Sequence, residues 1–121
     1  MKPTVLIVDD IAEIRDEIRH WLEPDFLIVG EASDGGEAVQ MAKELLPQLV
    51  VMDVSMPRTS GIDAVRQMTE EMPRPPKVVM LSGLTEDEVV IAALQAGAHD
   101  YLFKPGNADT LRATLVGLMN T

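Results

Sequence analysis

The sequence is most informative at first for what it lacks. It contains no cysteine, which excludes disulfides and thiolate chemistry, and aromatic residues make up only 3% of it, so aliphatic side chains must fill the core. Ten basic residues face 20 acidic ones, and a net charge of −10 argues against a nucleic-acid-binding surface, which needs clustered Lys and Arg. No apolar run approaches the roughly 18 residues of a membrane span, and no basic-plus-apolar leader is present. We therefore expect a cytoplasmic protein without membrane contact.

What is present is the length of one domain, 121 residues of which 46% are hydrophobic. Five apolar or β-branched runs predict strands, and several are continuous, as in parallel sheets covered on both faces. The runs lie at 4–8, 26–31, 49–53, 77–81 and 100–103. Stretches with helical spacing follow each run, such as Ile11, Ile14, Ile18 and Leu22 after the first. The alternation predicts an α/β fold: a (βα)5 doubly wound, five-stranded parallel sheet with the flavodoxin-like strand order 2-1-3-4-5.

Helix start signals separate the runs. Two stretches match the capping box, in which the side chains at the two ends of a helix's first turn accept backbone N–H groups. They are Asp34–Glu37 and Thr85–Glu88. A third helix is expected to begin near Gly61, with Thr59 or Ser60 as its cap.

Polar residues gather at the predicted carboxyl ends of the strands, which is where ligands bind in a doubly wound sheet. Asp9 and Asp10 follow the first strand, Asp53 the third, Ser82 the fourth and Lys104 the fifth. The first and third strands are expected to be neighbours about 4.8 Å apart, so the three aspartates should converge on one pocket. Three carboxylates need a cation. Magnesium fits because it takes carboxylates, keeps waters and shares its ligand shell with phosphoryl groups.

Each of these residues also has a purely structural interpretation. Asp10 with Glu13 would form a capping box for the first helix, although this leaves Asp9 unexplained. Asp53 ends an apolar strand and caps no helix, and a carboxylate there is costly unless it is paired or bound to metal. A single lysine such as Lys104 is usually a solvated surface residue. That all these positions lie at strand ends together favours a functional site.

Four stretches, in their order and spacing, resemble the receiver domain of bacterial two-component response regulators. They are VLIVDD, LVVMDVSMP followed by Gly61, VVMLSG, and AGAHDYLFKP, and the resemblance runs from residue 4 to about 119. It implies that residues 1–121 form one receiver domain. A receiver is a phosphoacceptor rather than an enzyme, although it promotes its own phosphorylation and dephosphorylation. Its phosphoryl donor would be a sensor histidine kinase or a phosphotransfer protein.

The resemblance assigns roles to residues of this chain. Asp53 would accept the phosphoryl group, and Asp9, Asp10 and the backbone carbonyl of Ser55 would hold Mg²⁺ with it. Lys104 would bind a phosphoryl oxygen. Counted formally, the three aspartates carry −3 and Lys104 with Mg²⁺ carries +3, so the pocket is neutral only when it is loaded.

Further residues would set the output and the lifetime of the signal. Ser82 would bind another phosphoryl oxygen, and Tyr101 would change rotamer on activation. Together they would reshape the surface of the fourth helix, fifth strand and fifth helix, through which the protein would meet a partner, an effector domain or a second copy of itself. The run 89–94 is too apolar for one buried stripe, so part of it should face outward there. Ser55 and Leu84 would flank the hydrolytic water and tune self-dephosphorylation.

Other functions fit parts of the sequence. A flavodoxin-like redox module shares the strand order, but it needs a hydroxyl- and glycine-rich phosphate loop where this chain has DDIAE. A haloacid-dehalogenase-type phosphatase would carry DxD where this chain has DDI. A degenerate receiver could act as a phosphorylation-independent interaction module, which the complete set of site residues disfavours. The sequence leaves open whether the protein is a single-domain regulator or has an effector domain, such as a DNA-binding domain, outside this chain.

Overall fold

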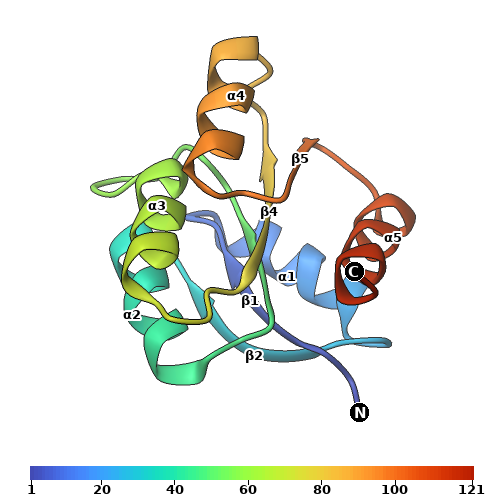
Figure 1. Ribbon diagram of the computed structural model, residues 1–121. Helices are drawn as coiled ribbons and strands as arrows, with labels where there is room; N and C mark the ends of the chain where they lie inside the picture. Colours follow the sequence, from blue (N-terminus) through green and yellow to red (C-terminus); the bar gives the residue numbers. More distant parts are fainter.

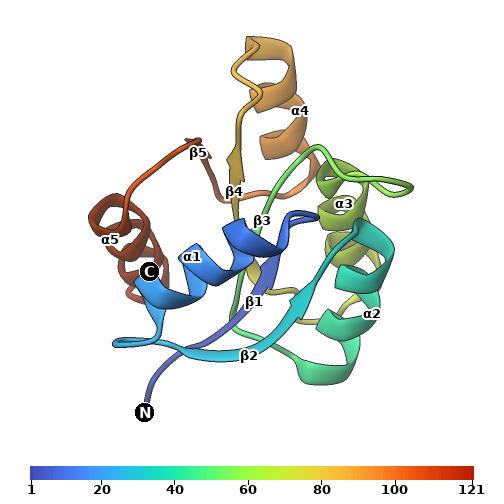
Figure 2. The same cartoon turned by 180° about the vertical axis from the view of Figure 1, so that it is seen from behind.

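The computed structural model describes all 121 residues and has the predicted topology, a parallel sheet with strand order β2-β1-β3-β4-β5 (Figures 1 and 2). The strands are β1 (Thr4–Val8), β2 (Leu27–Ala32), β3 (Leu49–Met52), β4 (Lys77–Ser82) and β5 (Asp100–Phe103). The helices are α1 (Ala12–Leu22), α2 (Gly35–Leu45), α3 (Gly61–Glu71), α4 (Asp87–Ala96) and α5 (Ala108–Met119). None of them has the length and apolar character that crossing a membrane requires. The prediction of a doubly wound α/β fold is confirmed.

Different helices cover the two faces of the sheet. On one face, α1 and α5 pack over a cluster that includes Val5 and Ile7, and on the other α2, α3 and α4 pack over a cluster that includes Leu6 and Val8. Successive side chains of a strand point to opposite faces, so a strand covered on both sides is apolar at every position. Each fully buried aliphatic side chain stabilises the fold by about 1.5–3 kcal/mol. This explains the continuous apolar runs of the sequence.

Three helices begin at a side-chain cap. The side chains of Asp34, Ser60 and Asn107 each accept a hydrogen bond from the backbone N–H three residues later, at 2.9, 3.2 and 2.8 Å. Such a cap satisfies one of the N–H groups that the first turn leaves without a partner. The predictions at Asp34 and Ser60 are confirmed, and the cap of α5 is an additional one.

The predicted capping box Thr85–Glu88 is wrong, and so is the alternative interpretation in which Asp10 and Glu13 cap the first helix. The residues that precede α1 and α4 are Ile11 and Glu86, and neither helix has a side-chain cap. Before α1, the carboxylate that turns toward the backbone is Asp9, whose Oδ1 accepts from the N–H of Ile11 at 2.9 Å. The structural interpretation of Asp10 therefore fails.

The strands end in register at their carboxyl edge, and this alignment builds the site. The Asp53 N–H donates to the Val8 carbonyl at 3.0 Å, and the Lys104 N–H donates to the Ser82 carbonyl at 2.9 Å. The observed bounds of β2, β3 and β4 differ from the predicted ones by a single residue, and Ser82 closes β4 rather than following it. Residues that are far apart in the chain thus meet along one edge.

Candidate functional site

The centre of the site is an ammonium group held between two buried carboxylates. Lys104 Nζ donates to Asp9 Oδ2 at 2.8 Å and to Asp53 Oδ2 at 2.9 Å. Asp9 is 1% exposed and Asp53 is 7% exposed, so neither charge is compensated by water. Burial lowers the pKa of Lys104, but the hydrogen bonds and charges of the two aspartates outweigh it and raise that pKa above its usual value. The lysine therefore stays charged, and it points into the site rather than into solvent.

Asp10 completes a set of three carboxylates that fits a hard divalent cation. One oxygen from each of Asp9, Asp10 and Asp53 lies within 4.8 Å of the other two. Asp10 is exposed and its carboxylate makes no hydrogen bond or ion pair, so its lone pairs are available. The Ser55 N–H lies 3.4 Å from Asp53 Oδ1, which places this peptide beside the carboxylates. A set of oxygen donors without nitrogen or sulfur ligands suits Mg²⁺. The three aspartates with Lys104 as the only cation have a formal charge of −2, which a divalent cation would neutralise.

Ser82 and Tyr101 meet through the peptide of Leu84. Ser82 is fully buried, and its hydroxyl accepts from the Leu84 N–H at 3.3 Å. The Tyr101 hydroxyl donates to the Leu84 carbonyl at 2.6 Å, and its ring packs edge-on against Phe103 with centroids 5.6 Å apart. Tyr101 is only 8% exposed. Its ring is therefore turned inward in this structure, and the predicted change of its rotamer on activation stays a prediction.

A group of charges that sequence reasoning missed fixes the backbone of the site. Arg15 donates through Nη1 to the Asp9 carbonyl at 2.7 Å and through Nε to Glu31 at 3.0 Å. Arg19 binds the second oxygen of Glu31 at 2.8 Å. Burial raises the pKa of Glu31, but the hydrogen bonds from both arginines outweigh it and lower that pKa. The sequence carried a signal for this group: Glu31 is an acidic residue inside the otherwise apolar β2, which lies next to β1. Two arginines, Arg15 and Arg19, follow each other at a spacing of four residues on α1.

The loop between β3 and α3 is held tightly around Asp53. At Gly61, a Cβ atom would lie 2.1 Å from the Asp53 carbonyl oxygen, so only glycine allows this approach. Arg58, in the left-handed region with φ of 65°, pairs with Asp34 at the start of α2. The N–H of Glu37 and the Arg58 guanidinium hold the pKa of Asp34 below its usual value. The backbone of Asp53 therefore lies against the start of α3, and the loop is tied through Arg58 to the start of α2.

Comparison with known proteins identifies the family. Residues 5–116 match the response regulator receiver domain. This chain belongs to that family. The receiver is 38% identical to the transcriptional regulatory protein LiaR of Bacillus subtilis over 119 residues, which are 93% of this chain and 56% of LiaR. The chain therefore spans about half the length of that relative.

Solved structures of receiver domains have the same fold as this chain. The response regulator domain of Thermotoga maritima CheB superposes with a TM-score of 0.92 at 35% identity, covering 100% of this receiver and 98% of that chain. CheY in the CheX–CheY–BeF3–Mg²⁺ complex from Borrelia burgdorferi gives a TM-score of 0.90 at 27% identity, covering 97% and 89%. Receiver domains are generally phosphoacceptors of two-component systems rather than enzymes, and they bind Mg²⁺ at an acidic site. The family assignment decides against the redox and phosphatase alternatives.

Proposed function

We propose that residues 1–121 form one receiver domain that accepts a phosphoryl group on Asp53. In the cytoplasm, the donor would be the phosphohistidine of a sensor histidine kinase or of a phosphotransfer protein. The observation that carries the proposal is the convergence of three aspartates and Lys104 at one edge of the sheet. A degenerate receiver needs no such cluster, and two buried carboxylates that share one lysine are costly to retain.

The chemistry follows from the positions of the groups. An Asp53 oxygen attacks phosphorus, an O–P bond forms, and the P–N bond of the protonated phosphohistidine breaks with its electron pair returning to the imidazole. The Lys104 ammonium, which binds Asp53 in the structure, can transfer a hydrogen bond to a phosphoryl oxygen. Ser82 uses its oxygen to accept from Leu84, so its O–H proton remains to donate to another phosphoryl oxygen. Mg²⁺ held by Asp9, Asp10, Asp53 and the Ser55 carbonyl would supply positive charge to the transferring group.

The signal would reach the surface through the Leu84 peptide. If Ser82 moves toward the phosphoryl group, it would shift the Leu84 peptide, to which both Ser82 and Tyr101 are hydrogen-bonded. Tyr101 in turn packs against Phe103, which is half exposed on β5. Differences of a few kcal/mol are enough to invert such a two-state balance. The expected homodimer through α4, β5 and α5 stays a prediction.

Phosphoryl uptake tests the proposed site. The receiver is incubated with acetyl phosphate or phosphoramidate and Mg²⁺, and its intact mass is followed for the increment of one phosphoryl group. We expect uptake by the wild type and none by Asp53→Asn, which keeps the shape of the side chain but is not nucleophilic. Uptake by Asp53→Asn at the wild-type rate would show that the assignment is wrong. A wild type that takes up nothing would favour the degenerate receiver.

A second experiment tests the coupling. Ser82→Ala should still accept a phosphoryl group at Asp53 but should respond poorly at the surface. The measurement is the amide NMR spectrum with and without a beryllofluoride mimic of the phosphoryl group. Wild-type shift changes across residues 86–119 in Ser82→Ala would refute coupling through this hydroxyl.

A further inference from the structure

A cleft, the amino-edge cleft, opens at the amino edge of the sheet, opposite to the edge that carries Asp53. Its walls come from the segment that precedes β3, the segment that precedes β4 and the ends of α2, α3 and α5. Its volume is about 760 Å³, which is within the range of small-molecule sites. The phosphoacceptor site uses none of these residues, so the cleft is a separate feature of the molecule.

The walls of the amino-edge cleft are apolar and rigid. Half of the eight prolines of the chain line it. They are Pro47, Pro73, Pro75 and Pro76. A proline ring fixes its own backbone torsion, so the cleft is largely formed before a ligand arrives and binding loses little conformational entropy. No lining residue is aromatic, so the walls suit an aliphatic group rather than a stacked base.

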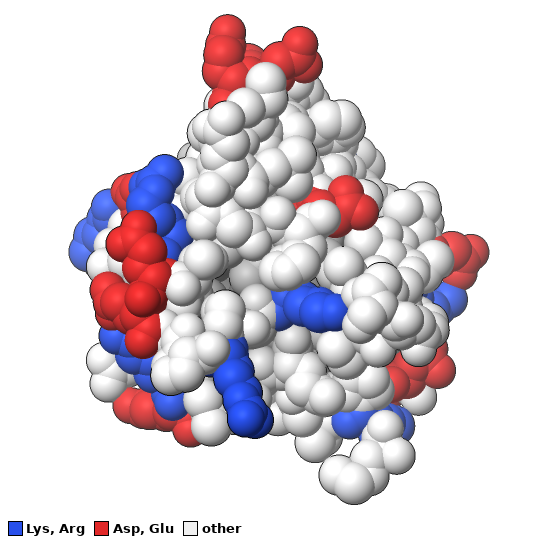
Figure 3. Space-filling model, in the orientation of Figure 1, with Lys and Arg blue, Asp and Glu red and all other residues white.

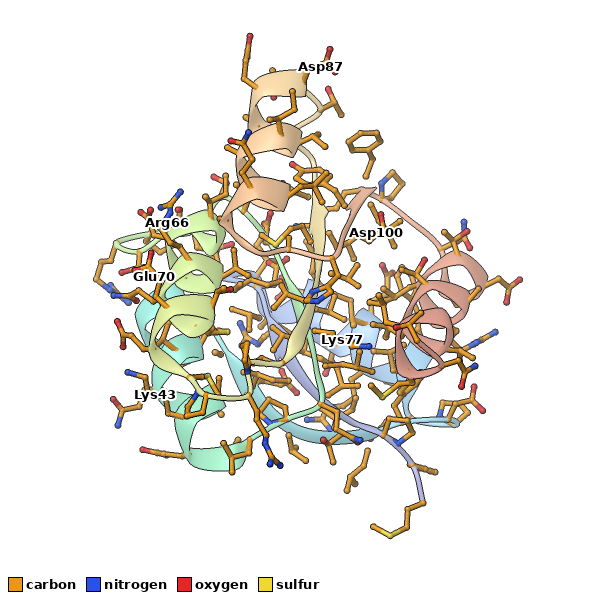
Figure 4. The ribbon with its side chains drawn as sticks, in the orientation of Figure 1. Lys43, Arg66, Glu70, Lys77, Asp87 and Asp100 are labelled. Carbon is orange, nitrogen blue, oxygen red and sulfur yellow. The ribbon has the colours of Figure 1, made fainter.

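The charge of the cleft is opposite to that of the protein. Three basic residues and one acid line it, which gives a formal charge of +2, while the whole chain carries −10. Lys43 and Lys77, which Figure 4 labels, come from α2 and from the start of β4. In the space-filling view, the blue groups below the centre are surrounded by white atoms (Figure 3). An anion would therefore be attracted here and repelled by most of the remaining surface.

Two of the three cations have no carboxylate partner. Lys43 pairs with Glu71, whereas Arg74 is exposed and forms no ion pair or hydrogen bond. The Lys77 ammonium donates to the Leu118 carbonyl at 2.6 Å, which is a neutral acceptor. A guanidinium can bind a carboxylate through two parallel hydrogen bonds, and Lys77 is only three residues from Arg74. A carboxylate is therefore the head group that these donors fit.

A leucine in a strained conformation also lines the cleft. Leu46 ends α2 with φ of 51°, in the left-handed region where glycine or asparagine is usual and a larger side chain is destabilising. Its side chain is 68% exposed, so no buried packing offsets this strain. Backbone strain of this kind is concentrated at functional sites. A ligand that covered the Leu46 side chain would supply the missing contact.

We propose that the amino-edge cleft binds a small organic anion, a carboxylate with an aliphatic body. The carboxylate would accept hydrogen bonds from Arg74 and Lys77, and the aliphatic body would lie against the prolines and Leu46. An anionic membrane or a nucleic acid would meet the field of the whole acidic protein, whereas a small anion responds mainly to charges within a Debye length of about 8–10 Å. The inference goes beyond the proposed function, since it uses no residue of the phosphoacceptor site.

The probe is octanoate, and its binding is followed through the amide NMR shifts of the whole chain. We expect saturable shifts at residues 43–48 and 72–77 and at the end of α5. Acetate has the head group without the chain, and octyltrimethylammonium has the chain with a positive head group. Both should bind at least about tenfold more weakly. Octanoate-induced shifts only elsewhere in the chain, or equal affinity for either control compound, would overturn the proposal.

A matched pair of variants separates the cleft from the general effect of positive charge. Arg74→Gln should weaken octanoate binding several-fold. Arg66→Gln removes the same charge from α3, where Arg66 pairs with Asp63 outside the cleft, and it should leave the affinity nearly unchanged. Circular dichroism checks that both variants are folded. Equal weakening by the two substitutions would mean nonspecific attraction and would refute the proposal.

A third variant, Leu46→Gly, tests the strained residue. It should raise the melting temperature by a few degrees, because glycine adopts a φ of 51° without strain. It should also weaken octanoate binding several-fold, because the side chain that the ligand covers is gone. An unchanged affinity for octanoate would show that the ligand does not lie against Leu46, and the proposal would be wrong.

The last control asks whether a second copy of the chain occupies the cleft. Amide spectra are recorded without octanoate at two protein concentrations about tenfold apart. We expect residues 43–48 and 72–77 to have the same shifts in both. If raising the concentration alone reproduces the shifts that octanoate causes, the occupant is a second copy and the proposal is overturned.

Discussion

Replacing Lys104 by methionine removes the cation from the centre of the site while keeping an unbranched side chain of similar length. Asp9 and Asp53, 1% and 7% exposed, would then face each other without a positive charge between them. Two charge-assisted hydrogen bonds are lost, each of which contributes about 1.5–3 kcal/mol. The lysine side chain is 19% exposed, so water can enter and the lower end of that range applies. We expect the free energy of unfolding to fall by about 3 kcal/mol.

Urea unfolding in the presence of a metal chelator, followed by circular dichroism, measures this loss. The matched control is Lys43→Met. Lys43 also pairs with a carboxylate, Glu71, but the two side chains are 45% and 46% exposed. An exposed pair of this kind contributes no more than about 1 kcal/mol, so the control should be nearly neutral.

Magnesium provides the second half of the test. A divalent cation bound by Asp9, Asp10 and Asp53 replaces the charge that Lys104→Met removes. It should therefore bind Lys104→Met more tightly than the wild type and stabilise it more, because a ligand of the folded state adds a stability that grows as the logarithm of 1 + [L]/Kd. The reasoning is refuted if Lys104→Met is no less stable than Lys43→Met, or if magnesium stabilises the variant and the wild type equally.

Three other predictions concern charge and lifetime. Asp10→Ala should raise the melting temperature of the metal-free protein by about 3–5 °C, because it relieves about 1 kcal/mol of repulsion between carboxylates. It should also weaken Mg²⁺ binding. A lower melting temperature of the metal-free variant would contradict this prediction. Burial, with the charge of Lys77, lowers the pKa of His99, whose Nδ1 accepts from the Val78 N–H at 3.2 Å. As the pH falls below 6.5, His99 is therefore protonated first in the unfolded chain, and the thermal stability of the folded protein should decrease. His99→Asn should flatten this decrease. The same dependence of melting temperature on pH in both proteins would contradict the prediction. Leu84→Glu should shorten the lifetime of the phosphorylated state, because leucine cannot orient the hydrolytic water and glutamate can. The lifetime is measured as loss of the phosphoryl mass with time, and an unchanged or longer lifetime would contradict the prediction.

The sequence predicts the fold and the centre of the site for the same physical reason. Parallel strands covered on both faces must be apolar at every position, so the first polar residue after each run marks the carboxyl edge of the sheet. Asp9, Asp53 and Lys104 are therefore recognisable at strand ends, although 95 residues separate the first from the last. Gly61 is predictable as part of the family pattern, and its reason is the Asp53 carbonyl beneath it.

The details that sequence did not predict depend on contacts between elements. Thr85 has the residue type of a cap, yet α4 begins one residue later than that cap requires and carries none. Arg15 looks like an ordinary helical arginine, and only the packing of α1 beside β2 brings it to Glu31 and the Asp9 carbonyl. The inward position of Tyr101 depends likewise on the loop after β4, which local sequence does not fix.

The central claim is that Asp53 is the residue that receives the phosphoryl group. Its most direct test is to incubate the protein with phosphoramidate and Mg²⁺, reduce it with sodium borohydride, and sequence its peptides by tandem mass spectrometry. Borohydride converts an aspartyl phosphate to homoserine and leaves free aspartate unchanged. We predict homoserine at position 53 and aspartate at positions 9 and 10. Homoserine at Asp9 or Asp10, or a phosphoryl group found on a serine while Asp53 stays unmodified, would contradict the account.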